Sequence, residues 1–344
     1  MKLSDIDACV ELLARHPDFL SIYGGQREPL RAVLKRLVTT LGFFGVVLEA
    51  AEASHIEMFG VGAVAFLTED FASAAKAPPF FLLGPTILQR LLKDESPVLS
   101  DKELLRASVV DGLTVFAWPL GFRNEYLKIP EVLNYLMGSF MEEIGGYKLK
   151  EFLGQTTDVE GARVSLHSGA ILLTPRGTYT DLPPTGAQEL LLEPHLLVIT
   201  RESALRRVGA WSSSIFIYND PKIGFTRSEQ RLLEAALRGL TDDELALELD
   251  VSISAVKKTW RSIYSRVEGS GAAILPELPE DRADPNDRGR GKKHRLLNYV
   301  REHPEELRPV SMKLLRQRQA GLMKTKRPSP LRLHRHRVRR PRVN

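Results

Sequence analysis

The segment from Phe225 to Val267 constrains the fold more than any other part of the chain, because helix start signals occur in it three times in succession. Two of these signals are a threonine followed three residues later by a glutamate, the spacing of a capping box at the first turn of a helix. Gly239 predicts the end of the first helix, and Ser252 predicts the N-cap of the third. The two capping boxes are Thr226 with Glu229 and Thr241 with Glu244.

Apolar residues recur at spacings of three and four within each of these stretches, which predicts helices that each bury one face. A tight turn through Asp250 and Val251 separates the second helix from the third. Three short helices in this order are typical of a helix-turn-helix, whose third helix enters the major groove of DNA. The expected buried faces are Leu232, Leu233, Ala236 and Leu237 in the first helix, Leu245, Ala246 and Leu249 in the second, and Val256, Ile263 and Val267 in the third.

Charge is sorted between the second and the third of these helices. All charged side chains of the second helix are acidic, and all charged side chains of the third helix are basic. A cationic helix with its charges on the solvent side can neutralise phosphates and contact guanine edges. A solvated basic surface is the alternative interpretation, but the succession of cap, glycine, cap, turn and basic helix favours DNA binding. The acidic residues are Asp242, Asp243, Glu244, Glu248 and Asp250, and the basic ones are Lys257, Lys258, Arg261 and Arg266.

Residues 223–268 resemble the C-terminal DNA-binding domain of LuxR-type bacterial transcriptional regulators. The residues that carry the resemblance are Phe225–Thr226, Glu229, Gly239–Leu240–Thr241, Leu245–Ala246 and Val256–Lys257. The resemblance implies that Lys257, Lys258 and Arg261 face double-stranded DNA, and that Ser252 and Ser254 lie near phosphates or base edges. It also implies a homodimer.

The segment departs from the LuxR-type pattern at several positions. Asp242 and Asp243 stand where the family commonly has a polar and a basic residue, and Thr259 and Trp260 also differ. Two alternatives stay open on these residues. One is a protein similar to region 4 of bacterial sigma factors, which shares the motif and tolerates acids on the second helix. The other is a protein–protein module that no longer touches DNA.

The formal charge of +5 does not describe the chain evenly. Residues 324–344 hold nine Lys or Arg and no acid, which leaves 39 basic and 43 acidic residues in 1–323, a net charge of −4. A polyanionic partner is therefore expected at a local basic patch or at the tail, not over the whole surface.

The sequence predicts a cytoplasmic protein with no membrane partner. The longest apolar run, Leu41 to Leu48, is far shorter than the roughly 18 residues that a membrane span needs. Three acids near the N terminus argue against a secretory signal. Cys9 is the single cysteine, so no internal disulfide can form.

The predicted fold is an α+β N-terminal domain, followed by an all-α helix-turn-helix domain and a disordered basic tail. The expected parts are an α+β sensory or regulatory domain over 1–220, the helix-turn-helix over 221–268, a flexible linker over 269–291, a short helix within 292–310 and the tail over 311–344. The expected helices of the first part are Asp5–Arg15, Pro29–Leu41, Pro85–Lys93 and Val132–Ile144, and the expected strands are Phe43–Leu48, Val61–Leu67, Leu113–Trp118, Ala170–Leu173, Leu196–Thr200 and Ser214–Tyr218.

Glu57-Met58-Phe59-Gly60-Val61-Gly62 is the one stretch of 1–220 with a hint of chemistry. It weakly resembles the acetyl-CoA pyrophosphate loop of GNAT-type acetyltransferases, which gives an acyltransferase-like protein as the alternative function. A strand whose glycines allow close backbone approach is favoured instead, because Glu57 would repel phosphate. No catalytic set, cofactor or metal site is expected, and the effector that the first part would sense is unknown from sequence.

Overall fold

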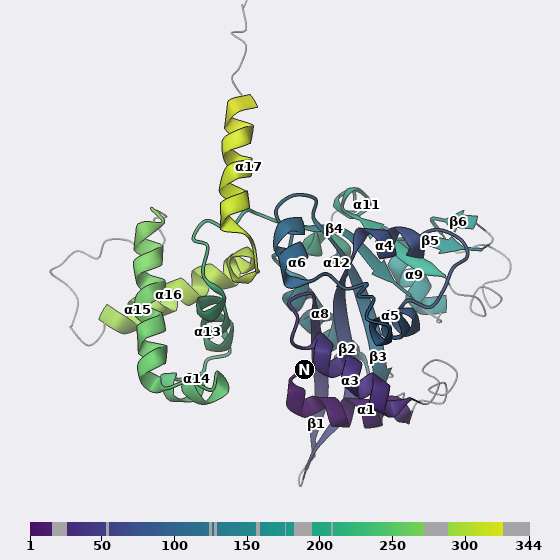
Figure 1. The fold of residues 1–344 in the computed structure, drawn as a ribbon, viewed down its shortest axis with the longest axis horizontal. Coiled ribbons are helices and arrows are strands. Elements are labelled where there is room, and N and C mark those ends of the chain that lie inside the picture. Colours follow the sequence, from purple (N-terminus) through teal and green to yellow (C-terminus); the bar gives the residue numbers. More distant parts are fainter. Residues whose placement is uncertain are drawn as a thin grey trace, which may run out of the picture.

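The computed structural model describes residues 1–15, 26–52, 55–123, 126, 129–155, 159–175, 177–181, 195–207, 209–271 and 288–325. A seven-stranded sheet lies between two groups of helices, and a further group of helices follows later in the chain (Figure 1). We call the sheet with its two flanking groups of helices the sheet part, and the later group the helical part. The α+β class expected for the first part is confirmed.

The sheet has the order β1-β2-β3-β4-β7-β5-β6, and β3 with β4 is the one parallel pair among these strands. Five of the six predicted strands are present, and β4 and β6 were not predicted. The strands are β1 (Phe43–Glu52), β2 (His55–Leu67), β3 (Leu113–Phe122), β4 (Leu149–Gly154), β5 (Ile171–Thr174), β6 (Gly177–Tyr179) and β7 (Leu196–Thr200).

Both faces of the sheet are buried, since successive side chains of a strand point to opposite sides. Along β2, Ala63 and Ala65 join one hydrophobic cluster and Val64 and Phe66 join the other. The first cluster includes α1 (Ile6–Ala14), α3 (Arg27–Leu37), α4 (Glu69–Ala75) and α5 (Leu83–Leu92). The second includes α6 (Asp101–Ala107), α8 (Pro130–Ile144), α9 (Val159–His167), α11 (Arg201–Leu205) and α12 (Trp211–Ile215).

The four helices predicted in the sheet part are confirmed as α1, α3, α5 and α8, but the strand predicted at Ser214–Tyr218 is wrong. This stretch begins inside the short helix α12. The hydroxyls of Ser213 and Ser214 donate to the carbonyls of Ala210 and Trp211, both at 2.7 Å. Such local side-chain bonds compete with pairing in a sheet.

The helical part has a hydrophobic core of its own. It consists of α13 (Arg227–Leu237), α14 (Asp242–Glu248), α15 (Ile253–Gly269), α16 (Arg288–Glu302) and the 3₁₀ helix η2 (Pro304–Leu307). The predicted apolar faces of the first three helices are buried, with Leu237 and Leu249 at the edge of the core. α16 adds Leu296 and Val300 to this core. It is the short helix predicted within 292–310, but it begins earlier, at Arg288. Residues 272–287 of the predicted linker lie outside the described residues.

The predicted caps are present. Thr226, Thr241 and Ser252 each accept a hydrogen bond from the backbone N–H three residues on. Gly239 has a φ of +84°. Asp250, with a φ of +53°, ends α14 in the same left-handed conformation, and the N–H groups of Asp250 and Val251 bond the carbonyls of Leu247 and Ala246. This pattern is a Schellman motif, which turns the chain sharply from α14 into α15.

The prediction of a disordered tail over 311–344 is wrong for residues 312–325, which form α17 (Met312–Thr325). Leu315 is buried, and Arg318 donates to the Val109 carbonyl at 2.7 Å and pairs with Asp220. Non-local contacts with the sheet part thus hold a helix that its basic composition did not reveal. Residues 326–344 lie outside the described residues. No described helix combines the length and the apolar character needed to cross a bilayer.

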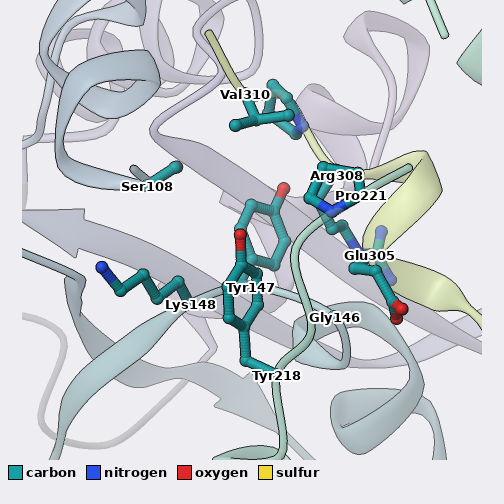
Figure 2. A pocket seen from close by; sticks show the side chains of 10 residues that line it. Ser108, Gly146, Tyr147, Lys148, Tyr218, Pro221, Glu305, Arg308 and Val310 are labelled. Carbon is teal, nitrogen blue, oxygen red and sulfur yellow. The ribbon is translucent and has the colours of Figure 1, made fainter. Parts of the chain in front are cut away.

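The helical part docks on the C-terminal end of α8. Arg308 donates to the carbonyls of Gly145 (2.7 Å) and Glu142 (2.8 Å), and its guanidinium lies 5.1 Å from the centre of the Tyr147 ring. Figure 2 shows Gly146 and Tyr147 of the sheet part beside Glu305 and Arg308 of the helical part. Gly146 has a φ of +80°, and a Cβ there would lie 2.4 Å from the Glu305 nitrogen. This contact requires glycine.

Replacing Gly146 with alanine is therefore expected to lower the free energy of unfolding by about 2 kcal/mol or more, through both the left-handed backbone and the collision. Gly138→Ala is the matched control, because it lies in the interior of α8 with open space around it. That change is expected to raise the free energy of unfolding by about 0.5–1 kcal/mol. Urea unfolding of both variants measures the difference, and equal stability of Gly146→Ala and wild type would contradict the docked arrangement.

Candidate nucleic-acid interface

α15 has one buried face and one exposed face. Val256, Trp260, Ile263 and Val267 are 0–6% exposed and pack into the core of the helical part. The opposite face carries polar and basic side chains at spacings of i, i+3, i+4 and i+7, which places them on one side of the helix. These exposed residues are Ser254, Lys257, Lys258 and Arg261.

The three cations of this face are not neutralised by the rest of the described chain. Lys257, Lys258 and Arg261 are all exposed, and none makes a hydrogen bond or ion pair with another described residue. α15 lies on the side of the helical part away from the sheet part (Figure 1). The structure therefore brings the predicted basic residues together on an open surface. We call this surface the basic face of α15.

Both serines predicted at the interface lie at the start of α15. The Ser252 hydroxyl accepts from the Ala255 N–H at 3.2 Å, and its oxygen is 2.8 Å from that of Ser254. The first turn of a helix presents N–H groups and a partial positive charge, which favours an anion such as phosphate. The two serines therefore border the most electropositive end of the basic face.

Arg266 does not belong to the basic face, contrary to the prediction that all four cations of this helix point to solvent. Its Nε donates to the Glu229 carboxylate at 2.8 Å. The helix also runs on past Val267 to include Glu268, which pairs with Lys292 of α16 at 3.6 Å. The acid at the far end of α15 thus has a basic partner.

Glu229 fastens α15 to α13. Its carboxylate, 2% exposed, accepts hydrogen bonds from the Thr226 N–H (2.7 Å), the Ser262 hydroxyl (2.7 Å) and Arg266. Burial alone would raise the pKa of Glu229, but these hydrogen bonds and the positive charge of Arg266 outweigh it and lower the pKa. The cap of the first helix is therefore also the anchor of the third.

Two departures from the LuxR-type pattern form a single interaction. The Trp260 indole N–H donates to the Asp242 carboxylate at 3.2 Å, and Lys293 of α16 donates to the same oxygen at 3.0 Å. The Lys293 ammonium also lies 4.7 Å from the centre of the Trp260 ring, within range of a cation–π interaction. Asp242 thus joins α14, α15 and α16, which explains an acid at this position.

Two other acids of α14, Glu244 and Glu248, are also engaged by groups of the protein itself. The Glu244 carboxylate caps its own helix by accepting from the Thr241 N–H at 2.7 Å. Glu248 pairs with Arg238 and with Lys2 of the sheet part, both at 3.0 Å. These contacts reduce the repulsion that a run of acids would exert on a polyanion near α15.

Sequence reasoning missed Trp260 and Lys293. The spacing of Val256, Trp260, Ile263 and Val267 along the helix was a signal for the buried tryptophan, but Lys293 lies 51 residues from Asp242 and no local pattern links them.

Residues 57–62 form part of a strand, as favoured from the sequence, and not the alternative pyrophosphate loop. These residues lie inside β2, which is paired with β1 on one side and β3 on the other. Backbone N–H groups in the middle of a sheet are taken up by neighbouring strands and cannot cradle a phosphate. Glu57 pairs with Arg123 across the β2–β3 pair.

Comparison with protein-family models, curated proteins and solved structures finds no match to this chain. The proposed function therefore depends on the geometry of the residues described above.

Glu229→Gln is expected to lower the free energy of unfolding at pH 7 by about 2–3 kcal/mol, because it leaves Arg266 without its carboxylate. The pKa of Glu229 is lower in the folded chain, so its stabilising effect is complete above the unfolded value of about 4.3 and is lost as pH falls through the folded value. The difference between wild type and variant should therefore shrink below about pH 4, as measured by urea unfolding across pH.

Glu244→Gln is the control for this prediction. Glu244 holds the same capping-box position in α14, but its carboxylate accepts hydrogen bonds from Thr241 of its own helix start and does not reach across to α15 as Glu229 does. A smaller decrease in stability is expected from it. Equal decreases in the two variants would show that Glu229 acts only as a cap.

Proposed function

We propose that the protein is a DNA-binding transcriptional regulator in which α14, the turn at Asp250 and α15 act as a helix-turn-helix. The observation that carries the proposal is the basic face of α15, whose three cations lie unpaired by other described residues and opposite a fully packed apolar face. Like charges that lie together on a solvated helix repel one another and gain nothing from solvation alone. In a groove lined by phosphates, the same charges are neutralised and contribute to binding.

The dimensions of α15 suit a major groove. Its 17 residues give a length of roughly 25 Å, and the basic face occupies its N-terminal half, the part that approaches bases in this motif. Lys257 and Lys258 are placed to reach phosphates or base edges, and the planar guanidinium of Arg261 suits the two acceptors of guanine. Ser252 and Ser254 would contact the DNA backbone beside them.

The remaining parts have supporting roles in this proposal. The sheet part receives a signal and passes it to the helical part, and the protein acts in the cytoplasm as a homodimer, as the LuxR-type resemblance implies. Asp242 and Glu248 of α14 are compatible with DNA binding, because each forms an ion pair with a basic side chain of the protein itself.

The proposal predicts that the full chain with Lys257→Ala, Lys258→Ala and Arg261→Ala binds DNA much more weakly than wild type. With a pool of duplexes of randomised sequence, we expect the affinity at about 0.1 M salt to fall at least tenfold. The slope of log affinity against log salt should become shallower by about one unit for each phosphate that the variant no longer neutralises. Fluorescence anisotropy over a salt series measures both.

The control variant carries Lys35→Ala, Lys93→Ala and Lys102→Ala, three exposed lysines of the sheet part, and has the same net charge as the triple variant of α15. Because residues 326–344 are strongly basic and can bind DNA without specificity, both variants are also compared in chains that end at Thr325. If the two triple variants retain DNA equally in the shortened chain, α15 is not the DNA-binding helix and a protein–protein role for the helical part gains support.

A further inference from the structure

A cavity of about 330 Å³ lies where the sheet part, the segment before the helical part and α17 meet. Its volume is at the lower end of the range of small-molecule sites. Four cations border it, together with the carboxylates of Asp111 and Asp220 and the phenol of Tyr218. The cations are Lys148 and Lys150 of β4 and its approach, Arg201 of α11 and Arg318 of α17.

Two of these four cations, Lys148 and Arg201, lack a carboxylate partner within the described part of the chain, whereas the other two have one. Lys150 pairs with Glu69 at 2.8 Å, and Arg318 pairs with Asp220. The Lys148 ammonium instead donates to the carbonyls of Val109 (2.9 Å) and Val110 (2.8 Å), which leaves its charge in place.

Arg201 makes no hydrogen bond or ion pair with any other residue that the structure describes. The wall of the cavity formed by Lys148 and Arg201 is therefore positive without compensation by a bonded acid.

Polar groups next to this wall are also unsatisfied. The Nε of Arg318 is buried and has no hydrogen-bond partner, and the same holds for the Ser108 hydroxyl. Ser108 lines a second, much smaller cavity of about 10 Å³ that shares Lys148 and Tyr218 with the first (Figure 2). Buried donors without partners are rare in folded proteins and call for a bound group or ordered water.

The charges of the cavity favour an anion in a second way. Burial lowers the pKa of Lys148, and the nearby positive charge of Arg318 lowers it further, which together outweigh the opposite effect of the Asp220 and Asp111 carboxylates. Hydrogen bonds from Arg318 and Gln319 outweigh burial and lower the pKa of Asp220, so that this carboxylate stays ionised and is already used by Arg318. A bound anion would relieve the repulsion between the two cations.

We propose that this cavity binds a small phosphate-bearing molecule, with Arg201 and Lys148 holding the phosphate and Arg318 bordering it from α17. A phosphate suits these residues because its several oxygens accept from a guanidinium and an ammonium at once. The ligand would bridge the sheet part and α17 and strengthen their contact. Its role as the signal of a DNA-binding regulator rests on the proposed function, whereas the binding itself does not.

The test is a thermal unfolding series of the full chain with inorganic pyrophosphate, inorganic phosphate and, at equal ionic strength, sodium chloride. Pyrophosphate at a hundredfold excess over its dissociation constant is expected to raise the melting temperature by roughly 5 °C, and chloride is not. Arg201→Gln should weaken pyrophosphate binding about tenfold or more, as measured by titration calorimetry. It should not lower the unliganded melting temperature, because Arg201 makes no hydrogen bond or ion pair with another described residue and its charge repels that of Lys148.

Arg206→Gln is the matched control, since Arg206 lies at the end of the same short helix but pairs with Glu202 and does not border the cavity. The site is overturned if Arg201→Gln and Arg206→Gln bind pyrophosphate alike, or if pyrophosphate gives wild type no more stabilisation than chloride. The variant with Lys257, Lys258 and Arg261 changed to alanine should keep the full pyrophosphate shift. Absence of the shift in that variant would place the anion on α15 and also overturn the cavity proposal.

Discussion

The helical part depends on one buried carboxylate. Glu229 accepts hydrogen bonds from the start of α13 and from two residues of α15, and it is almost completely shielded from water. A buried charge is stabilising only when all its partners are in place. The position of α15 is therefore coupled to the capping of α13, and a helix whose exposed side carries mutually repelling cations is held from its opposite side by Glu229 and the apolar core.

A second carboxylate explains how acidic α14 and basic α15 lie next to each other. Asp242 binds Trp260 and Lys293, so one acid holds three helices together while its charge is neutralised inside the unit. The net effect is separation of charge by position. Asp242 and Glu248 of α14 are paired with lysines and an arginine from elsewhere in the chain, whereas Lys257, Lys258 and Arg261 of α15 have no partner among the described residues. An acidic second helix is therefore compatible with a basic face on the third.

The sequence predicted the features that depend on residues close together in the chain, and it did not predict those that depend on contacts between distant residues. The caps at Thr226, Thr241 and Ser252 and the apolar faces depend on spacings of three and four residues, and the structure has them. α17 was missed because its anchor, Arg318, binds Asp220 and Val109, which lie 98 and 209 residues away. β4 was not predicted because Glu151 interrupts its apolar residues. The burial of Glu151 depends on an ion pair with Lys76, which lies at the end of α4, far away in the sequence.

The same non-local contacts define a physical route between the cavity and the basic face of α15. Arg318 holds Asp220, and two residues later the backbone N–H groups of Lys222 and Ile223 are held by the buried Glu306 carboxylate at 2.8 and 3.1 Å. This segment leads directly into α13, whose first turn contains Glu229, and Glu229 holds α15. A ligand that binds as proposed and tightens α17 on the sheet part would therefore act on the segment that leads into α13. Each step is a polar contact with a buried or half-buried partner, so these contacts connect Asp220 to the packed core of the helical part without an intervening solvent-exposed side chain.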